Sequence, residues 1–112
     1  MRLTELLDFL AYPAGMLVRR GFEREGWGDP DTLVVESPRR FMERLAGLYD
    51  NDLDYARLFI ILVACILTER GFRVPPDELL NAFERDDKNF INFWLEELKI
   101  IFKKEGENNG SG

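Results

Sequence analysis

The N-terminal segment of the chain predicts two helices separated by a proline. Its first apolar residues recur three and four positions apart, at Leu3, Leu6, Leu7 and Leu10. This spacing places the four side chains on one face of a helix. Pro13 should interrupt that helix, because the residue before a proline is pushed away from helical geometry. A second helix is expected over residues 14–25, although Gly15 and Gly21 disfavour it.

Turn-forming residues follow and lead to a third helix. Residues 26–31 combine glycine, aspartate and proline, which is typical of a turn. The short segment Thr32–Val35 is rich in strand-forming residues, so we expect an extended stretch there. Ser37 and Pro38 then fit a helix N-cap followed by proline at the first helical position, where a missing N–H group costs nothing. The helix that begins there should turn Phe41 toward the core.

The longest apolar segment, residues 55–67, predicts a core helix. Asp54 and Arg70 delimit a segment too long for an ordinary strand, and Gly71 suits the left-handed position after a helix end. The uninterrupted apolar part, Leu58–Leu67, spans only about 15 Å as a helix, against the ~30 Å of a bilayer core. We therefore expect a buried helix and no membrane association.

Two further helices complete the predicted fold. One should begin at Pro75-Pro76, where the next two residues are acidic and lie at the positive end of the helix dipole. The last should run over residues 87–104. Its apolar stripe consists of Phe90, Phe93, Trp94, Leu98, Ile101 and Phe102. Residues 105–112 are polar and glycine-rich, which predicts a disordered tail.

These elements predict one all-α domain over residues 1–104. We expect a compact bundle of five or six helices, because every segment with clear apolar periodicity is helical. In this bundle the apolar 53–70 helix should be central. The 88–104 helix should pack along it.

Composition fits a small folded domain with an acidic surface. Hydrophobic residues make up 46% of the 112 residues and aromatic residues 12%, which is more than a disordered chain carries. The net charge of −6 is spread over both halves of the chain, which opposes binding to phosphate backbones. A single cysteine permits no internal disulfide, and no secretion signal is visible, so we expect a cytoplasmic location.

Few residues are available for catalysis. The chain has no histidine, which removes the most frequent general base and metal ligand. Cys65 lies inside the apolar run and is expected to be a core residue rather than a nucleophile. Ser37 fits a helix cap and Ser111 lies in the tail, so a serine triad in its usual form is not available. We therefore predict a non-catalytic protein without a cofactor, a metal site or a small-molecule substrate.

A magnesium-dependent phosphohydrolase is the alternative from another functional class. Glu5 with Asp8, and Glu84 with Asp87, form carboxylate pairs one helical turn apart. If the two pairs faced each other across the bundle, they could hold Mg²⁺ for phosphate hydrolysis, as in helical pyrophosphohydrolases. Those enzymes carry a second set of paired glutamates, which this chain lacks.

Nucleic-acid binding is a further alternative. The basic residues gather in two clusters, Arg19, Arg20, Arg24 and Arg39, Arg40, Arg44. On one face they would contact phosphates, but the glutamates among them favour surface ion pairs instead. We therefore do not expect a nucleic-acid partner.

Aromatic density is the strongest positive signal in the sequence. The competing interpretation is that these side chains only fill the core. If some are exposed, they predict a partner surface, because exposed aromatics mark protein interfaces. The predicted function is a protein–protein interaction module of adaptor, inhibitor or assembly-chaperone type, binding another protein or a second copy of itself. The expected contact residues are Trp27, Phe90, Phe93, Trp94 and Phe102, with Arg20, Arg24, Arg40 and Arg44 on the rim.

Overall fold

Residues 1–110 form seven helices joined by short connections, and a computed structural model describes the side chains of residues 1–103. The helices are α1 (Leu3–Ala11), α2 (Ala14–Glu25), α3 (Pro30–Glu36), α4 (Pro38–Gly47), α5 (Leu53–Glu69), α6 (Pro76–Glu84) and α7 (Lys88–Gly110). Within residues 1–110 there is no strand. The all-α prediction is therefore confirmed, with seven helices instead of five or six.

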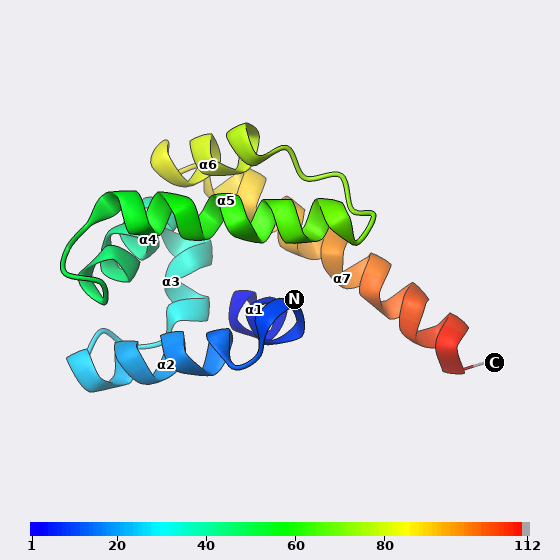
Figure 1. Ribbon diagram of the computed structural model, residues 1–112, viewed down its shortest axis with the longest axis horizontal. Coiled ribbons are helices and arrows are strands. Elements are labelled where there is room, and N and C mark those ends of the chain that lie inside the picture. The colour runs from blue at the N-terminus through cyan, green and yellow to red at the C-terminus, as the bar shows by residue number, and fades with distance from the viewer. Residues whose placement is uncertain (111–112) are drawn as a thin grey trace.

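The helices pack around a shared interior rather than along one axis. In Figure 1, α5 crosses the molecule with α6 above it and α2 below it, and α1 and α3 lie between α2 and α5. The α4 helix packs against α3, α5 and α6, and α7 packs mainly against α3 and α6. The last helix was expected to lie along α5. This expectation is not met, because α7 packs against α3 and α6 instead.

Local capping signals begin and end several helices, and those at Ser37, Pro38 and Gly71 were predicted from the sequence. The Ser37 hydroxyl accepts a hydrogen bond from the backbone N–H of Arg40 at 3.4 Å, and Pro38 is the first residue of α4. The Asp52 carboxylate accepts from the backbone N–H of Asp54 at 2.9 Å and begins α5. Gly71, with φ of 95°, follows α5 in the left-handed region that glycine enters freely.

The α3 helix corrects the extended segment predicted at Thr32–Val35. The Asp29 carboxylate accepts hydrogen bonds from the backbone N–H of Asp31 at 3.1 Å and from the Thr32 hydroxyl at 2.9 Å. Pro30 follows at the first helical position, and Val34 is buried. The same cap-and-proline signal that begins α4 therefore begins α3. Packing of Val34 in the core outweighs the strand preference of the segment.

A buried threonine joins the first three helices. The backbone N–H and the hydroxyl of Thr4 donate hydrogen bonds to the two carboxylate oxygens of Asp31, at 2.9 Å and 2.6 Å. The Thr4 hydroxyl also accepts from Nε of Arg19 at 2.9 Å. At the same crossing, Gly15 brings α2 against α1 so closely that an added Cβ would lie 1.9 Å from the Thr4 carbonyl oxygen. These contacts fix the position of α2 against α1 and α3. They therefore also fix where the exposed side of α2 lies on the surface of the protein.

The core is built around a row of phenylalanine rings. The rings of Phe22 and Phe41 are 5.8 Å apart and those of Phe41 and Phe83 are 6.2 Å apart, within the usual range for aromatic pairs. One side of α5 joins this core through Ala56, Ile60, Val63, Ala64 and Leu67. The other side of α5 is exposed, so the helix is not the fully buried central element that was predicted.

The C-terminal part of the chain is described only in part. The backbone of α7 continues to Gly110, past the end predicted at residue 104. The tail predicted over 105–112 falls on residues outside those whose side chains are described, so it stays a prediction. Among the described residues, no helix combines the length and the apolar character that a membrane crossing requires.

Candidate functional site

The most distinctive surface of the protein is the outer side of α5. Tyr55, Leu58 and Leu62 are 58%, 61% and 57% exposed, and Cys65 is exposed beside them. Positions 55, 58, 62 and 65 are three and four residues apart, so the side chains form one continuous stripe along the helix. We call these four residues the α5 face. Cys65 is therefore a surface residue, which corrects its predicted place in the core.

None of the four residues of the α5 face is charged, and Arg57, the arginine within the helix, binds two acidic side chains. Nε of Arg57 donates to the Glu84 carboxylate of α6 at 2.8 Å, and a terminal nitrogen donates to the Asp54 carboxylate at 2.9 Å. These hydrogen bonds, first to Glu84 and then to Asp54, raise the pKa of Arg57 above its usual value. The two hydrogen bonds hold the guanidinium between Asp54 and Glu84 of α6.

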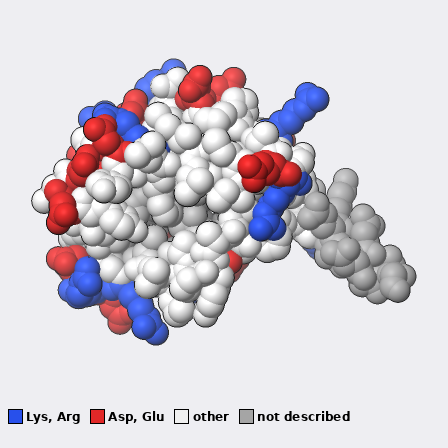
Figure 2. Space-filling view, in the orientation of Figure 1, with Lys and Arg blue, Asp and Glu red and all other residues white. Residues whose placement is uncertain are grey.

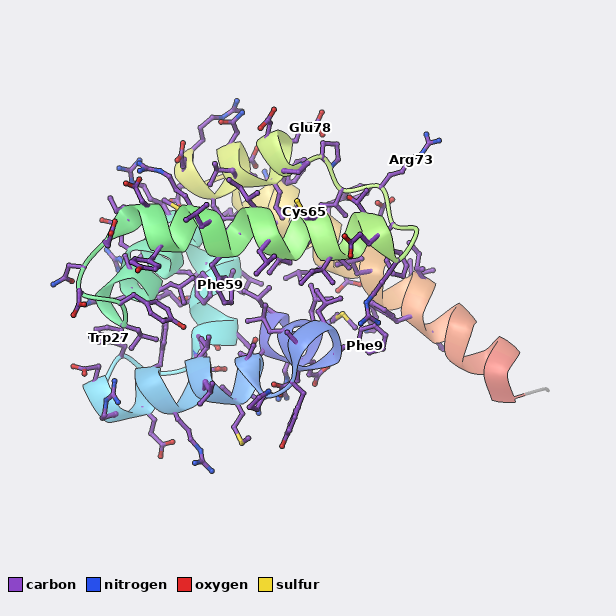
Figure 3. All side chains as sticks on the ribbon, viewed as in Figure 1. Phe9, Trp27, Phe59, Cys65, Arg73 and Glu78 are labelled. Atoms are coloured by element: carbon purple, nitrogen blue, oxygen red, sulfur yellow. The ribbon has the colours of Figure 1, made fainter. Side chains whose placement is uncertain are left out.

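A groove runs beside the α5 face. It is lined by Tyr49, Tyr55, Leu58, Phe59 and Leu62. The rings of Tyr49 and Tyr55 stack with centroids 6.1 Å apart. In Figure 3, Phe59 projects from α5 toward the space between α5 and α2. The stacked tyrosines line the groove and hold each other partly in place before any partner binds.

A second hollow continues this apolar surface toward α2. It shares Tyr49 with the first groove and is also lined by Leu17, Leu48, Arg20 and Arg24. Leu17 is largely exposed. Figure 2 shows the result as an uncharged area in front of α5, with charged side chains gathered around its rim. A contiguous apolar area of this kind marks a binding surface more often than an ordinary solvated one.

Trp27, the first of the predicted contact residues, is engaged within the protein. Its ring meets that of Phe22 edge-on at 5.3 Å, and the Arg44 guanidinium lies over it at 5.2 Å. An added Cβ on Gly47 would lie 2.9 Å from the Trp27 ring, so that glycine allows the close approach. Figure 3 shows Trp27 at the left of the molecule and Arg73 at the right, and Arg73 lines a groove with Phe93 and Trp94 of α7. The structure therefore does not bring Trp27 together with the aromatic side chains of α7.

The predicted aromatic stripe of α7 is mostly turned inward. Phe93 is 65% exposed, but Trp94 is only 8% exposed and Phe90 is half-buried. Phe102 is also half-buried, with its ring 4.6 Å from that of Phe9. Phe90, Phe93 and Trp94 line one groove between the start of α6 and α7. Phe93 is therefore the only one of the five predicted aromatic contacts that is more than half exposed.

The arginine clusters are divided among different partners. Arg19 donates to Thr4, and a terminal nitrogen of Arg39 donates to the Glu84 carbonyl oxygen at 2.9 Å. Arg44 covers Trp27. Arg20 and Arg24 line the hollow beside Leu17, while Arg40 is exposed on α4. The six arginines therefore lie on two helices, α2 and α4, and those with described contacts have different partners.

The four carboxylates of the phosphohydrolase alternative have separate structural roles. Glu5 lies 3.9 Å from Arg2, and the Asp8 carboxylate accepts from the backbone N–H of Met16. Glu84 holds Arg57, and the Asp87 carboxylate accepts from the backbone N–H of Phe90 and caps α7. Among the residues with described side chains, no three Asp, Glu, His or Cys residues are placed to share a metal ion. The convergence that this alternative required is not found.

Sequence reasoning missed the α5 face, although a signal for it was present. Apart from Arg57, every residue from Tyr55 to Leu67 is apolar or aromatic, so both the inner and the outer side of the helix carry apolar side chains. The other helices cover one side of α5, through Ala56, Ile60, Val63, Ala64 and Leu67. Comparison with known protein families, with curated proteins and with solved structures finds no match for this chain.

Proposed function

We propose that this protein is a small non-catalytic interaction module that binds a protein chain through the α5 face. The observation that carries this proposal is the stripe of four accessible, uncharged side chains next to an apolar groove. Large apolar side chains that lose water on contact supply most of the binding energy in protein interfaces, and tyrosine is enriched among them. Adaptor, inhibitor and assembly-chaperone roles are all consistent with such a surface.

The remaining features of the chain support the same class of function. The sequence has no histidine, and several of its carboxylates and arginines serve caps, ion pairs and ring contacts. The groove around Phe93 is a smaller surface with one accessible aromatic, and we propose it as a secondary contact only. We further propose a cytoplasmic location, because the accessible Cys65 would be prone to oxidation in an oxidising compartment.

Site-specific photo-crosslinking in the native cell tests this proposal. A benzophenone side chain at the position of Leu62 should give covalent adducts with a protein chain, because that position would lie within the interface. The same group at the position of Lys88, which is exposed on α7, is the matched control. We expect several-fold more adduct at position 62 than at position 88. Equal or absent adducts at the two positions would contradict the proposal.

A further inference from the structure

We propose that the groove between the start of α6 and α7 binds an extended, proline-containing peptide segment, and that Nε1 of Trp94 donates a hydrogen bond to a backbone carbonyl oxygen of that segment. We call the hollow lined by Phe90, Phe93 and Trp94 the Trp94 groove. It shares no residue with the α5 face or with the groove beside that face. This site therefore goes beyond the proposed function and does not depend on docking at α5.

Aromatic rings and a rigid backbone segment form the walls of the Trp94 groove. On the α7 side, Phe93 is 65% exposed and Phe90 is half-buried. On the other side, Val74 and Pro75 precede α6, and Pro75 is exposed with φ of −61° and ψ of 120°. Aromatic-lined grooves are the surfaces on which proline-rich segments dock. The chemistry of these walls therefore favours a ligand that contains proline.

Trp94 leaves one buried donor without an acceptor. Its side chain is 8% exposed, and Nε1 has no hydrogen-bond partner among the residues with described side chains. A buried indole N–H normally has a partner, because an unmet donor costs free energy. Trp94 also lines an interior hollow, where every other lining residue carries an aliphatic or phenylalanine side chain. The Trp94 groove is therefore the side from which an acceptor can reach this donor.

A ligand has to move a side chain to reach Nε1, because this atom is covered in the unbound chain. Of the three rings that line the groove, that of Phe93 is the most exposed. Exposed side chains change rotamer within nanoseconds, and rotamer changes at an interface are common on binding. The donor is therefore reached by rotation of an exposed side chain.

The lone N–H donor also selects the backbone conformation of the ligand. An α-helix uses its carbonyl oxygens internally, except in its last turn. An added strand would need a sheet edge, and residues 1–110 contain no strand. The polyproline II conformation forms no internal hydrogen bonds, so its carbonyl oxygens remain available. Proline fixes this conformation before binding, which lowers the entropy lost on binding. An extended proline-containing segment therefore fits the donor best.

Two glutamates give the groove a preference for a basic ligand. Glu78 of α6 and Glu97 of α7 both line it, and both are exposed. Among the residues with described side chains, neither carboxylate forms an ion pair. Arg73 also lines the groove, but in Figure 3 it extends away from the body of the molecule. A lysine or arginine next to the proline would therefore meet a carboxylate of opposite charge.

Nuclear magnetic resonance of the full, isotope-labelled chain tests the hydrogen bond. The probe is a short peptide of prolines with one central arginine. The chain has two tryptophans and therefore two indole N–H signals, which a Trp27→Phe sample assigns. The Trp94 signal should shift downfield to saturation while the Trp27 signal stays in place. We expect a dissociation constant on the order of 100 μM, because the groove is much smaller than a standard interface. A Trp94 signal that stays in place at millimolar peptide would overturn the proposal.

Paired variants separate the groove from general effects of substitution. Phe93→Ala should weaken binding of the peptide by at least about tenfold, whereas Ile100→Ala, at a similarly exposed position outside the groove, should not. Glu97→Gln should weaken it about threefold, whereas Glu96→Gln, outside the groove, should not. All four side chains are exposed, so the fold should tolerate each change. Equal effects within either pair would contradict the site.

A matched peptide with glycine in place of each proline tests the selectivity of the groove. It should bind at least about tenfold more weakly, because glycine loses more conformational freedom on binding. Equal affinity for the two peptides would overturn the preference for proline. Crosslinking at position 62 tests the α5 face separately, so failure of the peptide to bind leaves the proposed function standing.

Discussion

Replacing Leu58 with glutamate should weaken association through the α5 face by at least about 100-fold, because an unpaired carboxylate would be buried against apolar side chains. The free energy of unfolding of the single chain should stay within about 0.5 kcal/mol of wild type, because Leu58 is exposed there. Sedimentation measures the loss of association. Urea unfolding at low protein concentration measures the free energy of unfolding of the single chain.

The matched control for this change is Ile100→Glu. Ile100 is also an exposed aliphatic residue on a helix, but it lies on α7, outside the α5 face. Both variants add one negative charge, so any general effect of charge on association appears in both. Equal loss of association in the two variants would show that net charge, and not contact through α5, controls the interaction.

Gly15→Ala should destabilise the protein by about 3 kcal/mol, even though alanine is the better helix former. The added Cβ would lie 1.9 Å from the Thr4 carbonyl oxygen and 2.8 Å from its carbonyl carbon. These are backbone atoms of α1, so the clash is relieved only if α1 and α2 move apart. That movement would also strain the hydrogen bonds that join Thr4, Asp31 and Arg19. The midpoint of urea unfolding, followed by circular dichroism, measures the effect.

Gly21→Ala provides the comparison for this prediction. Its Cβ would lie 2.8 Å from the two end carbons of the Leu48 side chain, which can rotate away. The gain in helix propensity then offsets much of the cost, so the net change should stay within about 1 kcal/mol. A Gly15→Ala variant as stable as Gly21→Ala would show that the close crossing of α1 and α2 does not constrain the fold.

Local signals in the sequence predicted most helix ends, because capping depends on a few adjacent residues. Ser37 with Pro38, and Gly71 after α5, act as their chemistry predicts. The same logic was available for Asp29 with Pro30. It was outweighed by the β-branched residues that follow, and α3 was missed for that reason.

Exposure could not be predicted from the sequence in the same way, because it depends on which helices pack together. Aromatic density identified Trp94 as a contact residue, although the structure buries it. The apolar run identified α5 as a core helix, yet Leu58 and Leu62 face outward because no segment among the described residues covers them. Composition sets how much apolar surface a chain has, and only tertiary packing decides which part stays accessible.

The reactivity of Cys65 gives the most direct test that the α5 face is covered by protein when the molecule functions. This is the only cysteine in the chain, it is exposed on that face, and no substitution is needed to observe it. Its rate of modification by a maleimide can be measured in native cells and in dilute purified protein. We expect at least about tenfold slower modification in cells, and loss of that protection in Leu58→Glu. Equally fast modification in both settings would contradict a docking role for α5.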